Sequence, residues 1–440
     1  MSRAFDDNGS IWVDGAPDVE VAPPLRGDLD VDVAIIGGGF TGVSTAYHLS
    51  RRFPDRGIAL LEARRIGNGA SGRNGGLMLN GVTAGARTPE EVAREHELTC
   101  RAMDDLEALI AEHRLAVRYR RDGGVKLLTT QRSAEEGHAE VERLAALGVP
   151  LRFIGSGALG TVLRTRRAFG AILDPREGLL NGVDLLRAMR PLLVRQGVAI
   201  HENTVVERVR EGARIELETA AGTVRAAAIV LATNGYTPRL GYFTTGILPV
   251  LSHVVATDPL PADLLEATGL GRHAGFSDDL PRLAYGGVTP DGRLVFGGGS
   301  NAAYGYRWRN ATTYTARPDD AGARAVRRTM IDYFPELATI PIARRWSGPL
   351  GLTLRRHCAM GVTGAHANVY YALGYSGHGV VLANLAGRVL TDLYAGDHDA
   401  WRPYPFYGFQ PAGIAPEPLR WLGYRVYTRL TGRSPWKRVS

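Results

Sequence analysis

Three glycines near the N-terminus have the spacing of a phosphate-binding turn. Gly37, Gly39 and Gly42 form a G-x-G-x-x-G pattern that directly follows a short apolar run at 31–36. The first glycine of such a turn allows a tight bend, the second lets backbone approach a pyrophosphate, and the third lets helix and strand pack closely. Twenty residues after Gly42, Glu62 ends the next apolar run, where a carboxylate can bond both hydroxyls of a ribose. A purely structural glycine turn would not explain Glu62, so the pattern predicts a dinucleotide site.

A second glycine-rich segment helps to decide between NAD and FAD, which share this turn. Residues 67–76 read GNGASGRNGG, with five glycines in ten positions. Glycine at this density is entropically costly unless the backbone must pass very close to a ligand. A rigid isoalloxazine ring with its ribityl chain is a ligand of that kind, so the segment favours FAD. Arg73 either offsets a phosphate or a flavin carbonyl, or it is an ordinary surface arginine.

A third glycine-rich turn, GYSGHGV at 374–380, stands between a predicted strand and a predicted helix. It creates a second helix N-terminus, whose partial positive charge would stabilise the negative charge of a reduced flavin near N1 and the C2 carbonyl. His378 either hydrogen-bonds to that edge or caps the turn, and both interpretations stay open. A fourth turn, WSGPLG at 346–351, also follows a predicted strand.

The elements that must position these turns begin with a β-α-β unit. A strand is expected at 31–36, a helix at 41–52 and a strand at 57–62. The other helices are expected at 89–114, 133–147, 182–196, 317–333 and 380–394. The other strands are expected at 198–210, 213–219, 223–232, 249–257, 282–288, 293–299, 344–354 and 368–373, with a hairpin over 117–130.

Nucleotide-binding elements thus occur at the start, in the middle and near the end of the chain, with strand-rich insertions between them. We therefore expect an α/β fold, in which a FAD-binding Rossmann-like domain with a mainly parallel sheet is interleaved with an antiparallel-sheet substrate domain. The expected FAD-binding domain comprises 31–88, 175–247 and 344–400, and the substrate domain comprises 89–174 and 248–343, between an N-terminal arm at 1–30 and a C-terminal tail at 401–440.

The composition is that of an ordinary globular protein, with 440 residues of which 45% are hydrophobic and 22% charged. No apolar run reaches the roughly eighteen residues of a transmembrane helix, and the N-terminus lacks a signal-peptide pattern, so we expect a soluble cytoplasmic protein. Only two cysteines, Cys100 and Cys358, exclude a disulfide framework and a cysteine-ligated cluster. The net charge of +7 comes from arginines, which are scattered among acids except at 420–438. This distribution favours anionic small molecules over nucleic acid as binding partners.

Together these motifs resemble the D-amino acid oxidase-like family of FAD enzymes, and within it the γ-glutamylputrescine oxidase-like branch. The resemblance rests on IGGGFTG at 36–42, ASGRNGG at 70–76, WSG at 346–348 and GYSGHG at 374–379. Of these, the second and the fourth are specific, whereas the first is shared with many families. Trp12 in the N-terminal arm also fits that branch.

The resemblance implies an enzyme that oxidises an amine or amino acid, passing a hydride to flavin N5 and releasing an imine that hydrolyses. It also implies that the antiparallel sheet roofs the flavin. Carried over by motif, the implied FAD contacts are Gly37, Gly39, Phe40, Thr41, Gly42, Glu62, Ala63, Arg64, Ser71, Arg73, Asn74, Gly75, Gly76, Val205, Gly348, Gly374, Tyr375, Ser376, Gly377, His378, Gly379 and Val380.

This chain departs from the family pattern in three ways. Residues 353–361 read TLRRHCAMG, which places Arg355 where the family often has an acid. Monomeric sarcosine oxidase-like enzymes bind flavin covalently through a cysteine whose position corresponds by spacing to Gly348, so we expect non-covalent FAD. The same enzymes use a lysine to promote reaction with oxygen, and the equivalent stretch at 293–298 has none. Oxidase and dehydrogenase activity therefore both stay open.

The cofactor supplies the redox chemistry, so the protein must hold a neutral amine with its C–H over the flavin and exclude water. The candidates to face the ring are His253 and Tyr285, and Arg355 or Arg356 would clamp a carboxylate or phosphonate, with Arg355 favoured by its position. Each of these residues is equally compatible with a structural role. The expected partners are thus a small amine or amino acid, with an anionic one preferred, and oxygen or another electron acceptor.

Two other functions remain as alternatives. The chain could be a flavoprotein subunit that passes electrons to a partner protein or quinone. It would then dock through the basic aromatic segment at 418–427. The other interpretation of this segment is a helix packed on its own domain. A flavin domain for RNA modification is disfavoured, because the chain shows no RNA-binding domain.

Overall fold

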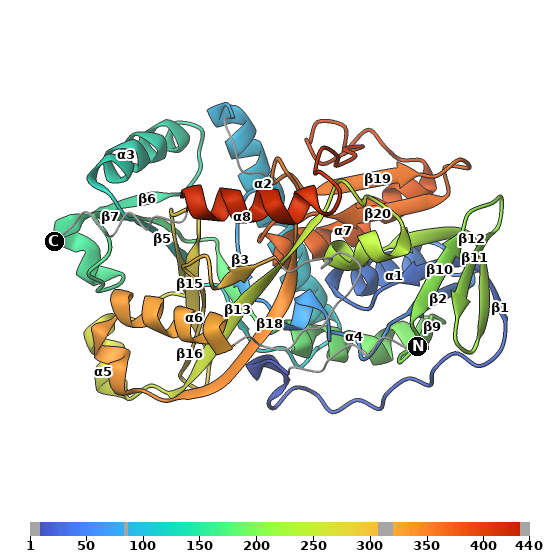
Figure 1. Ribbon diagram of the computed structural model, residues 1–440, viewed down its shortest axis with the longest axis horizontal. Coiled ribbons are helices and arrows are strands. Elements are labelled where there is room, and N and C mark those ends of the chain that lie inside the picture. The colour runs from blue at the N-terminus through green and yellow to red at the C-terminus, as the bar shows by residue number, and fades with distance from the viewer. Residues whose placement is uncertain (1–8, 83–86, 307–319, 432–440) are drawn as a thin grey trace.

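The computed structural model describes residues 9–82, 87–306 and 320–431. Figure 1 shows an elongated molecule with one large sheet toward each end of its long axis. One sheet is mixed and mainly parallel, and the other is rich in antiparallel pairs. The predicted α/β fold class is therefore confirmed.

The first sheet joins strands from distant parts of the chain. Parallel pairs link β1 to β2 and β12, β2 to β9, and β12 to β20, while β10, β11 and β19 add antiparallel pairs at the edges. The strands are β1 (Leu29–Ile36), β2 (Ile58–Leu61), β9 (Ala199–His201), β10 (Val206–Arg210), β11 (Ile215–Thr219), β12 (Gly222–Leu231), β19 (Ala359–Thr363) and β20 (Val369–Leu373). Side chains from four helices share one hydrophobic core with β1 and β2, which explains the apolar runs of these strands. These helices are α1 (Phe40–Arg52), α2 (Pro89–Glu112), α4 (Gly182–Arg195) and α7 (Gly379–Ala395).

The second sheet is antiparallel except where β14 pairs with β5. Its long central strand β13 lies between β18 on one side and β16 and β17 on the other. The strands are β5 (Gly124–Leu128), β6 (Arg152–Gly155), β7 (Gly170–Asp174), β13 (Leu248–Pro259), β14 (Gly275–Asp278), β15 (Ala284–Val288), β16 (Arg293–Gly298), β17 (Tyr304–Gly305) and β18 (Ile342–Leu352). The helices at this end are α3 (Gln131–Ala145), α5 (Ala262–Thr268) and α6 (Asp320–Tyr333).

The hairpin predicted over 117–130 is wrong. β4 (Tyr119–Arg120) pairs with β8 (Gly178–Leu180) in a small sheet that also contains β3 (Leu77–Met78). β5 instead pairs with β7 and β14. The glycines at 123–124 therefore carry the chain from one sheet to another rather than around a tight turn.

The N-terminal arm is fixed by its tryptophan. Trp12 lies in a short 3-10 helix, Ile11–Val13, and is 3% exposed. Its Nε1 donates to the carbonyl of Asn74, 2.8 Å away, inside the second glycine-rich segment. This part of the arm is thus packed against that segment. Residues 1–8 lie outside the described part of the chain.

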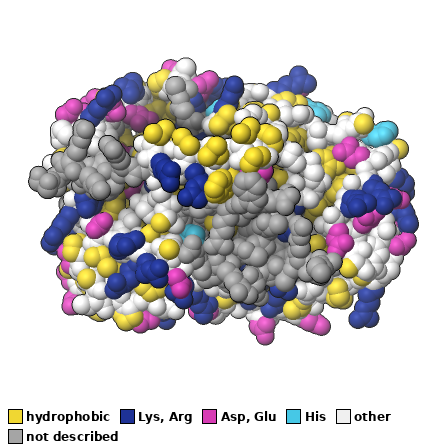
Figure 2. Space-filling view, in the orientation of Figure 1, with side chains coloured by type: hydrophobic (Ala, Val, Ile, Leu, Met, Phe, Trp, Pro, Cys, Tyr) yellow, Lys and Arg dark blue, Asp and Glu magenta, His cyan; other side chains and the backbone are white. Residues whose placement is uncertain are grey.

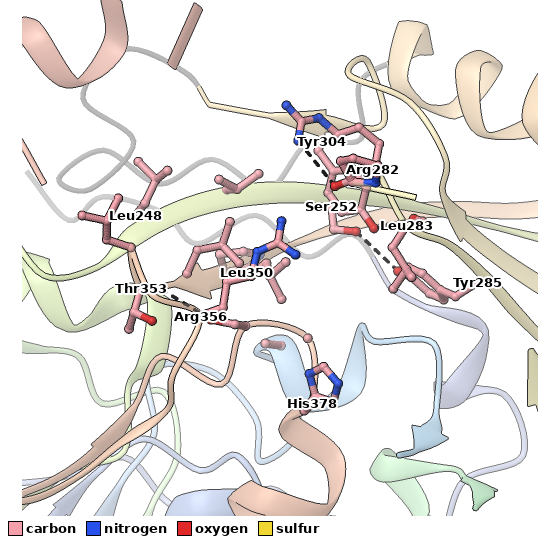
Figure 3. Close-up of a pocket in the computed structure, with 18 of the residues that line it drawn as sticks. Leu248, Ser252, Arg282, Leu283, Tyr285, Tyr304, Leu350, Thr353, Arg356 and His378 are labelled. Atoms are coloured by element: carbon pink, nitrogen blue, oxygen red, sulfur yellow. Dashed lines mark hydrogen bonds between the residues drawn. The ribbon is translucent and has the colours of Figure 1, made fainter. Parts of the chain in front are cut away.

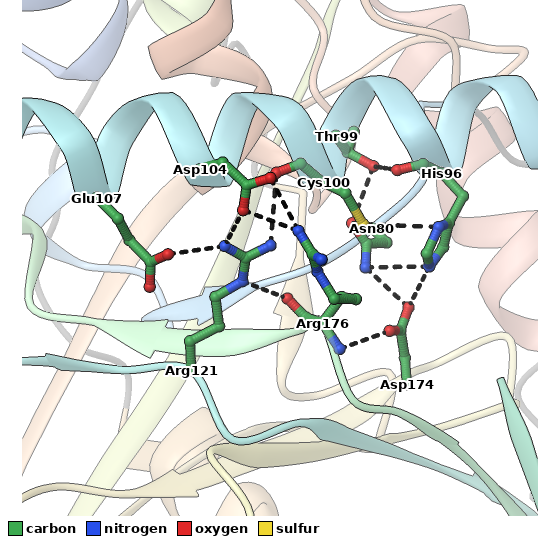
Figure 4. Close-up of polar contacts among 9 residues, drawn as sticks. All are labelled: Asn80, His96, Thr99, Cys100, Asp104, Glu107, Arg121, Asp174 and Arg176. Carbon is green, nitrogen blue, oxygen red and sulfur yellow. Dashed lines mark hydrogen bonds and ion pairs between the residues drawn. The ribbon is translucent and has the colours of Figure 1, made fainter. Parts of the chain in front are cut away.

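A buried polar cluster ties α2 to the second sheet (Figure 4). Nε2 of His96 lies 2.9 Å from Oδ2 of Asp174, and Nδ2 of Asn80 donates to the same carboxylate over 2.8 Å. Burial lowers the pKa of His96, but its hydrogen bonds to Asp174 and Cys100 outweigh that effect and raise the pKa to about 9. The imidazole is therefore protonated at neutral pH, and a charge-assisted pair holds α2 to β7.

The described part of the C-terminal tail contains a helix, which is one of the two interpretations that the sequence leaves open. α8 (Leu419–Thr431) lies across the surface, over the region where the two large sheets meet (Figure 1). None of the helices in the described residues is long and apolar enough to cross a membrane.

Candidate active site

The first glycine turn has the geometry expected of it. Gly37 adopts φ +110°, a conformation that side chains rarely allow. A Cβ on Gly42 would lie 1.8 Å from the carbonyl oxygen of Gly37, so only glycine lets α1 start this close to β1. Gly39 is the N-cap of α1 and provides no side-chain cap. In the first turn of the helix, the N–H of Phe40 donates to Oγ of Ser71 over 2.9 Å.

Glu62 follows β2 and faces this turn. Its Oε2 accepts from the N–H of Gly38 over 2.7 Å, and its Oε1 accepts from the N–H of Arg64 over 2.9 Å. Burial raises the pKa of Glu62, while these two backbone hydrogen bonds lower it. Each carboxylate oxygen keeps a second lone pair, so the group can still accept from two hydroxyls.

A cavity of about 570 Å³ runs over the first turn and past Glu62. Many of the predicted cofactor residues line it. They are Gly37, Gly39, Phe40, Thr41, Glu62, Ala63, Arg64, Ser71, Asn74, Val205, Tyr375, Gly377, Gly379 and Val380.

The third glycine-rich turn meets the first one. The hydroxyl of Tyr375 lies 2.6 Å from Oγ1 of Thr41, which ties the start of α1 to the turn before α7. α7 begins at Gly379 with His378 as its N-cap, and the imidazole makes no capping hydrogen bond. Of the two interpretations of His378, capping is therefore not what the structure shows. Two helix N-termini whose own N-cap residues make no side-chain capping bond converge on one cavity, an arrangement that favours a ligand with negative charge.

A second cavity, of about 820 Å³, continues from the first (Figure 3). The two cavities share Ala70, Asn74, Pro349, Leu350, Gly377 and Val380. Further predicted cofactor residues line the second cavity, namely Arg73, Gly75, Gly348, Ser376 and His378. Gly42, Gly76 and Gly374 line neither cavity. Arg73 is 5% exposed, so it is not the ordinary surface arginine that the sequence also allowed.

The second sheet forms the opposite wall of this cavity. Along β13, Leu248, Val250 and Ser252 line the cavity, so His253 faces the other side, because neighbouring side chains of a strand alternate. His253 is 3% exposed, and its Nδ1 lies 2.9 Å from the carbonyl oxygen of Ala303. The structure therefore corrects the prediction that His253 faces the ring.

Tyr285 on β15 lines the cavity. Its hydroxyl lies 3.4 Å from Oγ of Ser252 (Figure 3). A Cβ on Gly75 would come within 2.6 Å of the tyrosine ring, so the second glycine-rich segment passes directly against this side chain. Burial raises the pKa of Tyr285, which keeps its hydroxyl protonated at neutral pH.

Arg356, rather than Arg355, lines the cavity. The backbone makes a turn at this point, where the N–H of Arg356 donates to the carbonyl of Thr353 over 3.1 Å and Arg356 adopts φ +57°. Leu354 and Arg356 line the cavity and Arg355 does not, although both arginines are exposed. Figure 3 shows Arg356 at the wall of this cavity. The preference for Arg355 as the clamp is corrected accordingly.

Positive charge dominates the cavity lining within the described residues. Five cationic side chains line the cavity, against the carboxylates of Asp278 and Asp279. The cations are Arg73, Lys126, Arg282, Arg356 and Arg420. Burial and the nearby cations Lys126, Arg87 and Arg356 lower the pKa of His378 to about 4, so its imidazole is neutral. Lys126 was missed from the sequence, although it is one of only two lysines in the chain.

The sequence also did not indicate that α8 forms part of the cavity wall. Leu419, Arg420, Gly423, Tyr424 and Tyr427 of α8 line it. The hydroxyl of Tyr424 donates to the carbonyl of Tyr304 over 3.1 Å, and Nδ2 of Asn301 donates to the carbonyl of Thr428 over 2.8 Å. The inner side of α8 is thus packed on its own protein. This agrees with the interpretation of the segment as a packed helix, which the sequence allowed beside that of a docking surface.

Neither cysteine lines either cavity. Cys358 is 1% exposed and belongs to the core around α7, and burial raises the pKa of its thiol to about 12. Cys100 lies beside His96 on α2. Among the described residues, no group of three or more His, Cys, Asp or Glu side chains is placed to hold a metal ion.

Comparisons with known proteins agree with this geometry. Residues 32–393 match the model of a family described as FAD dependent oxidoreductase, DAO. The chain is similar to gamma-glutamylputrescine oxidoreductase of Escherichia coli (strain K12), at 28% identity over 92% of this chain and 93% of that protein. It is 30% identical to the probable oxidoreductase OrdL of Rhizobium meliloti (strain 1021), over 88% of this chain and 89% of that protein. Glycine oxidase from Geobacillus kaustophilus has the same fold, with a TM-score of 0.74 at 22% identity over 88% of this chain and 100% of that one.

Proposed function

The chain belongs to the family of FAD-dependent oxidoreductases that it matches over most of its length, and from this premise we propose that it oxidises the C–N bond of an amine or amino acid to an imine, which then hydrolyses. The two electrons removed from the substrate then pass to oxygen or to another acceptor. The family predicted from the glycine-rich motifs is confirmed by that match.

The observation that carries the proposal is the continuity of the two cavities. The first has the features that a dinucleotide needs, namely Glu62 and two helix N-termini without side-chain caps. The second is bounded by the antiparallel sheet and by α8, and it shares its lining with the end of the first near Gly377. A cofactor extended along the first cavity would therefore present its ring system to a substrate in the second.

These residues fit FAD, so each can be given a role. Glu62 would hold a ribose, the start of α1 would hold the pyrophosphate, and the start of α7 would face the ring. When bound, FAD accepts the hydrogen and the two electrons that leave the amine-bearing carbon. The protein's own task is then to position that carbon and to control its charge and hydration.

The cavity charge favours a neutral amine. An ammonium group placed among Arg73, Lys126 and Arg356 would be disfavoured by like charges, so its pKa would fall. The imidazole of His378 is neutral, so it adds no further positive charge beside the amine. Ser252 and Tyr285 would orient the substrate from the opposite wall, and α8 would exclude water.

The same charge favours a substrate with an anionic group. We assign the clamp for a carboxylate or phosphonate to Arg356, because an arginine can bind such a group with two parallel hydrogen bonds. Arg356 lies at the cavity wall near the shared residue Leu350 (Figure 3).

Anaerobic mixing with amines and amino acids tests this function. We expect the visible absorbance of the flavin to bleach with a primary or secondary amine that carries hydrogen on the amine-bearing carbon. A matched analogue with a methyl group in place of that hydrogen should leave the flavin oxidised. Bleaching by alcohols or thiols but by no amine would refute the proposal. Admitting oxygen to the reduced protein then distinguishes an oxidase, which reoxidises rapidly, from a dehydrogenase.

We also predict that FAD is bound without a covalent link. Glycine stands at position 348, and both cysteines lie away from the cavities. Precipitation with acid should therefore release yellow flavin into the supernatant. Flavin that stays with the protein pellet, and migrates with the denatured chain, would show that this prediction is wrong.

A further inference from the structure

α8 carries a row of exposed hydrophobic side chains on its outer face. Leu422, Val426 and Leu430 follow one another at helical spacing and are 53%, 48% and 76% exposed. Leu419, one turn earlier, is 60% exposed as well, but it borders the second cavity and is not counted in this row. In the space-filling view these side chains form a band along α8 (Figure 2). Exposed large hydrophobic residues elsewhere in the described chain are scattered, so this grouping calls for an explanation.

The row is bordered by positive charge. Arg425 and Arg429 are exposed, and on a helical projection both lie on the same flank of the row. The guanidinium of Arg425 stacks on the ring of Trp421, 4.8 Å from its centroid. The sequence contains no acidic residue from 418 to 440, whereas six basic residues occur there. The outer face of α8 is therefore both apolar and cationic.

The helix is held in place from its inner side. Besides the hydrogen bonds of Tyr424 and Thr428, the guanidinium of Arg282 lies over the ring of Tyr427, 5.1 Å from its centroid. These contacts leave Leu422, Val426 and Leu430 pointing outward from a helix that lies along the surface (Figure 1). The outer row therefore does not depend on α8 unfolding or detaching.

We propose that the outer face of α8 binds the surface of a membrane that contains anionic phospholipids. A surface helix with leucine and valine on one face, arginine beside it and tryptophan at its edge has the features of a helix that lies in the lipid headgroup region. Its hydrophobic side chains enter the acyl boundary, and its arginines pair with phosphate groups. This charge pattern selects a polyanionic surface over a second copy of this positively charged chain.

Co-sedimentation of the full-length, FAD-loaded protein with vesicles tests the proposal. We expect binding to vesicles of phosphatidylcholine and phosphatidylglycerol in equal parts, and at least tenfold weaker partitioning to phosphatidylcholine alone. Leu422→Glu and Val426→Glu should each reduce partitioning at least tenfold, since a carboxylate is placed against anionic lipid. Neither residue lines the two cavities, so FAD content and amine-dependent bleaching should match the unmodified protein.

A matched control is available on α4, where Val194 is 52% exposed. Val194→Glu adds the same charge to another exposed helical position and should leave vesicle binding unchanged. The proposal is overturned if the unmodified protein does not bind anionic vesicles. It is equally overturned if Leu422→Glu binds them as well as the unmodified protein does. It is also overturned if sedimentation velocity shows a dimer that Leu422→Glu dissociates while vesicles are not bound, because the face would then hold a second copy.

Discussion

Replacement of Glu62 by alanine is expected to weaken FAD binding by roughly 10- to 100-fold, because hydrogen bonds to a charged group contribute about 1.5–3 kcal/mol. In the protein, this carboxylate accepts from the N–H groups of Gly38 and Arg64 and faces the first cavity. The change removes the acceptor proposed for the ribose and also leaves the N–H groups of Gly38 and Arg64 without this partner. Titration of the apoprotein with FAD, followed by flavin fluorescence, measures the effect.

Glu202 provides the matched control. It is 2% exposed, and its carboxylate also accepts from two backbone N–H groups, those of Ala22 and Ile66. However, it does not line the cavity. Glu202→Ala should therefore lower thermal stability while leaving FAD affinity within about threefold, a difference below 1 kcal/mol. Equal losses of affinity in both variants, or a slower turnover with unchanged affinity at Glu62→Ala, would contradict the placement of the ribose at Glu62.

The cofactor half of the molecule was predictable because its constraints are local. The turn requires glycine at position 37, and the close contact between helix and strand requires glycine at position 42. Glu62 directly follows the second strand, so all three positions lie within one β-α-β unit. The sequence therefore placed α1 and β2 to within one residue at each end. The domain boundaries drawn from the sequence stay a prediction, although segments far apart in the chain do share each sheet.

The substrate half was less predictable because its constraints are tertiary. Alternation shows that Ser252 and His253 face opposite sides of β13, but only the packing of β13 against the rest of the molecule shows which side is the cavity. Arg356 adopts a left-handed conformation in a turn that its N–H closes on the carbonyl of Thr353. No local pattern indicates it, because arginine does not favour that conformation.

The role of α8 could be inferred only in part. The basic and aromatic character of this segment is plain from the sequence, which left open whether it docks a partner or is a helix packed on its own domain. Which face of α8 packs inward depends on Asn301 and Tyr304, more than a hundred residues earlier. A pattern within the helix therefore cannot show that Tyr424 and Tyr427 close a cavity while Leu422 and Val426 remain exposed.

Replacement of Arg356 by leucine is expected to raise KM for an anionic amino substrate by roughly 10- to 100-fold, since a charge-assisted, two-point contact is lost. An uncharged analogue, such as the corresponding amide, should keep its kcat/KM within about twofold. Arg356→Lys should recover only part of the loss, because an ammonium group cannot form two parallel hydrogen bonds in the geometry of a guanidinium. Neither leucine nor lysine is branched at Cβ, so the left-handed backbone at this position is no more strained than with arginine.

The neighbouring Arg355 is the natural control. It has the same charge, stands in the same turn and is likewise exposed, but it does not line the cavity. Steady-state kinetics of Arg355→Leu should therefore match those of the unmodified protein with both substrates, which separates a specific clamp from a general loss of positive potential. Equal effects of Arg356→Leu on the anion and on its uncharged analogue would make Arg356 structural. A selective loss at Arg355 instead would return the clamp to the residue that the sequence pattern favoured, and would require this turn to rearrange when substrate binds.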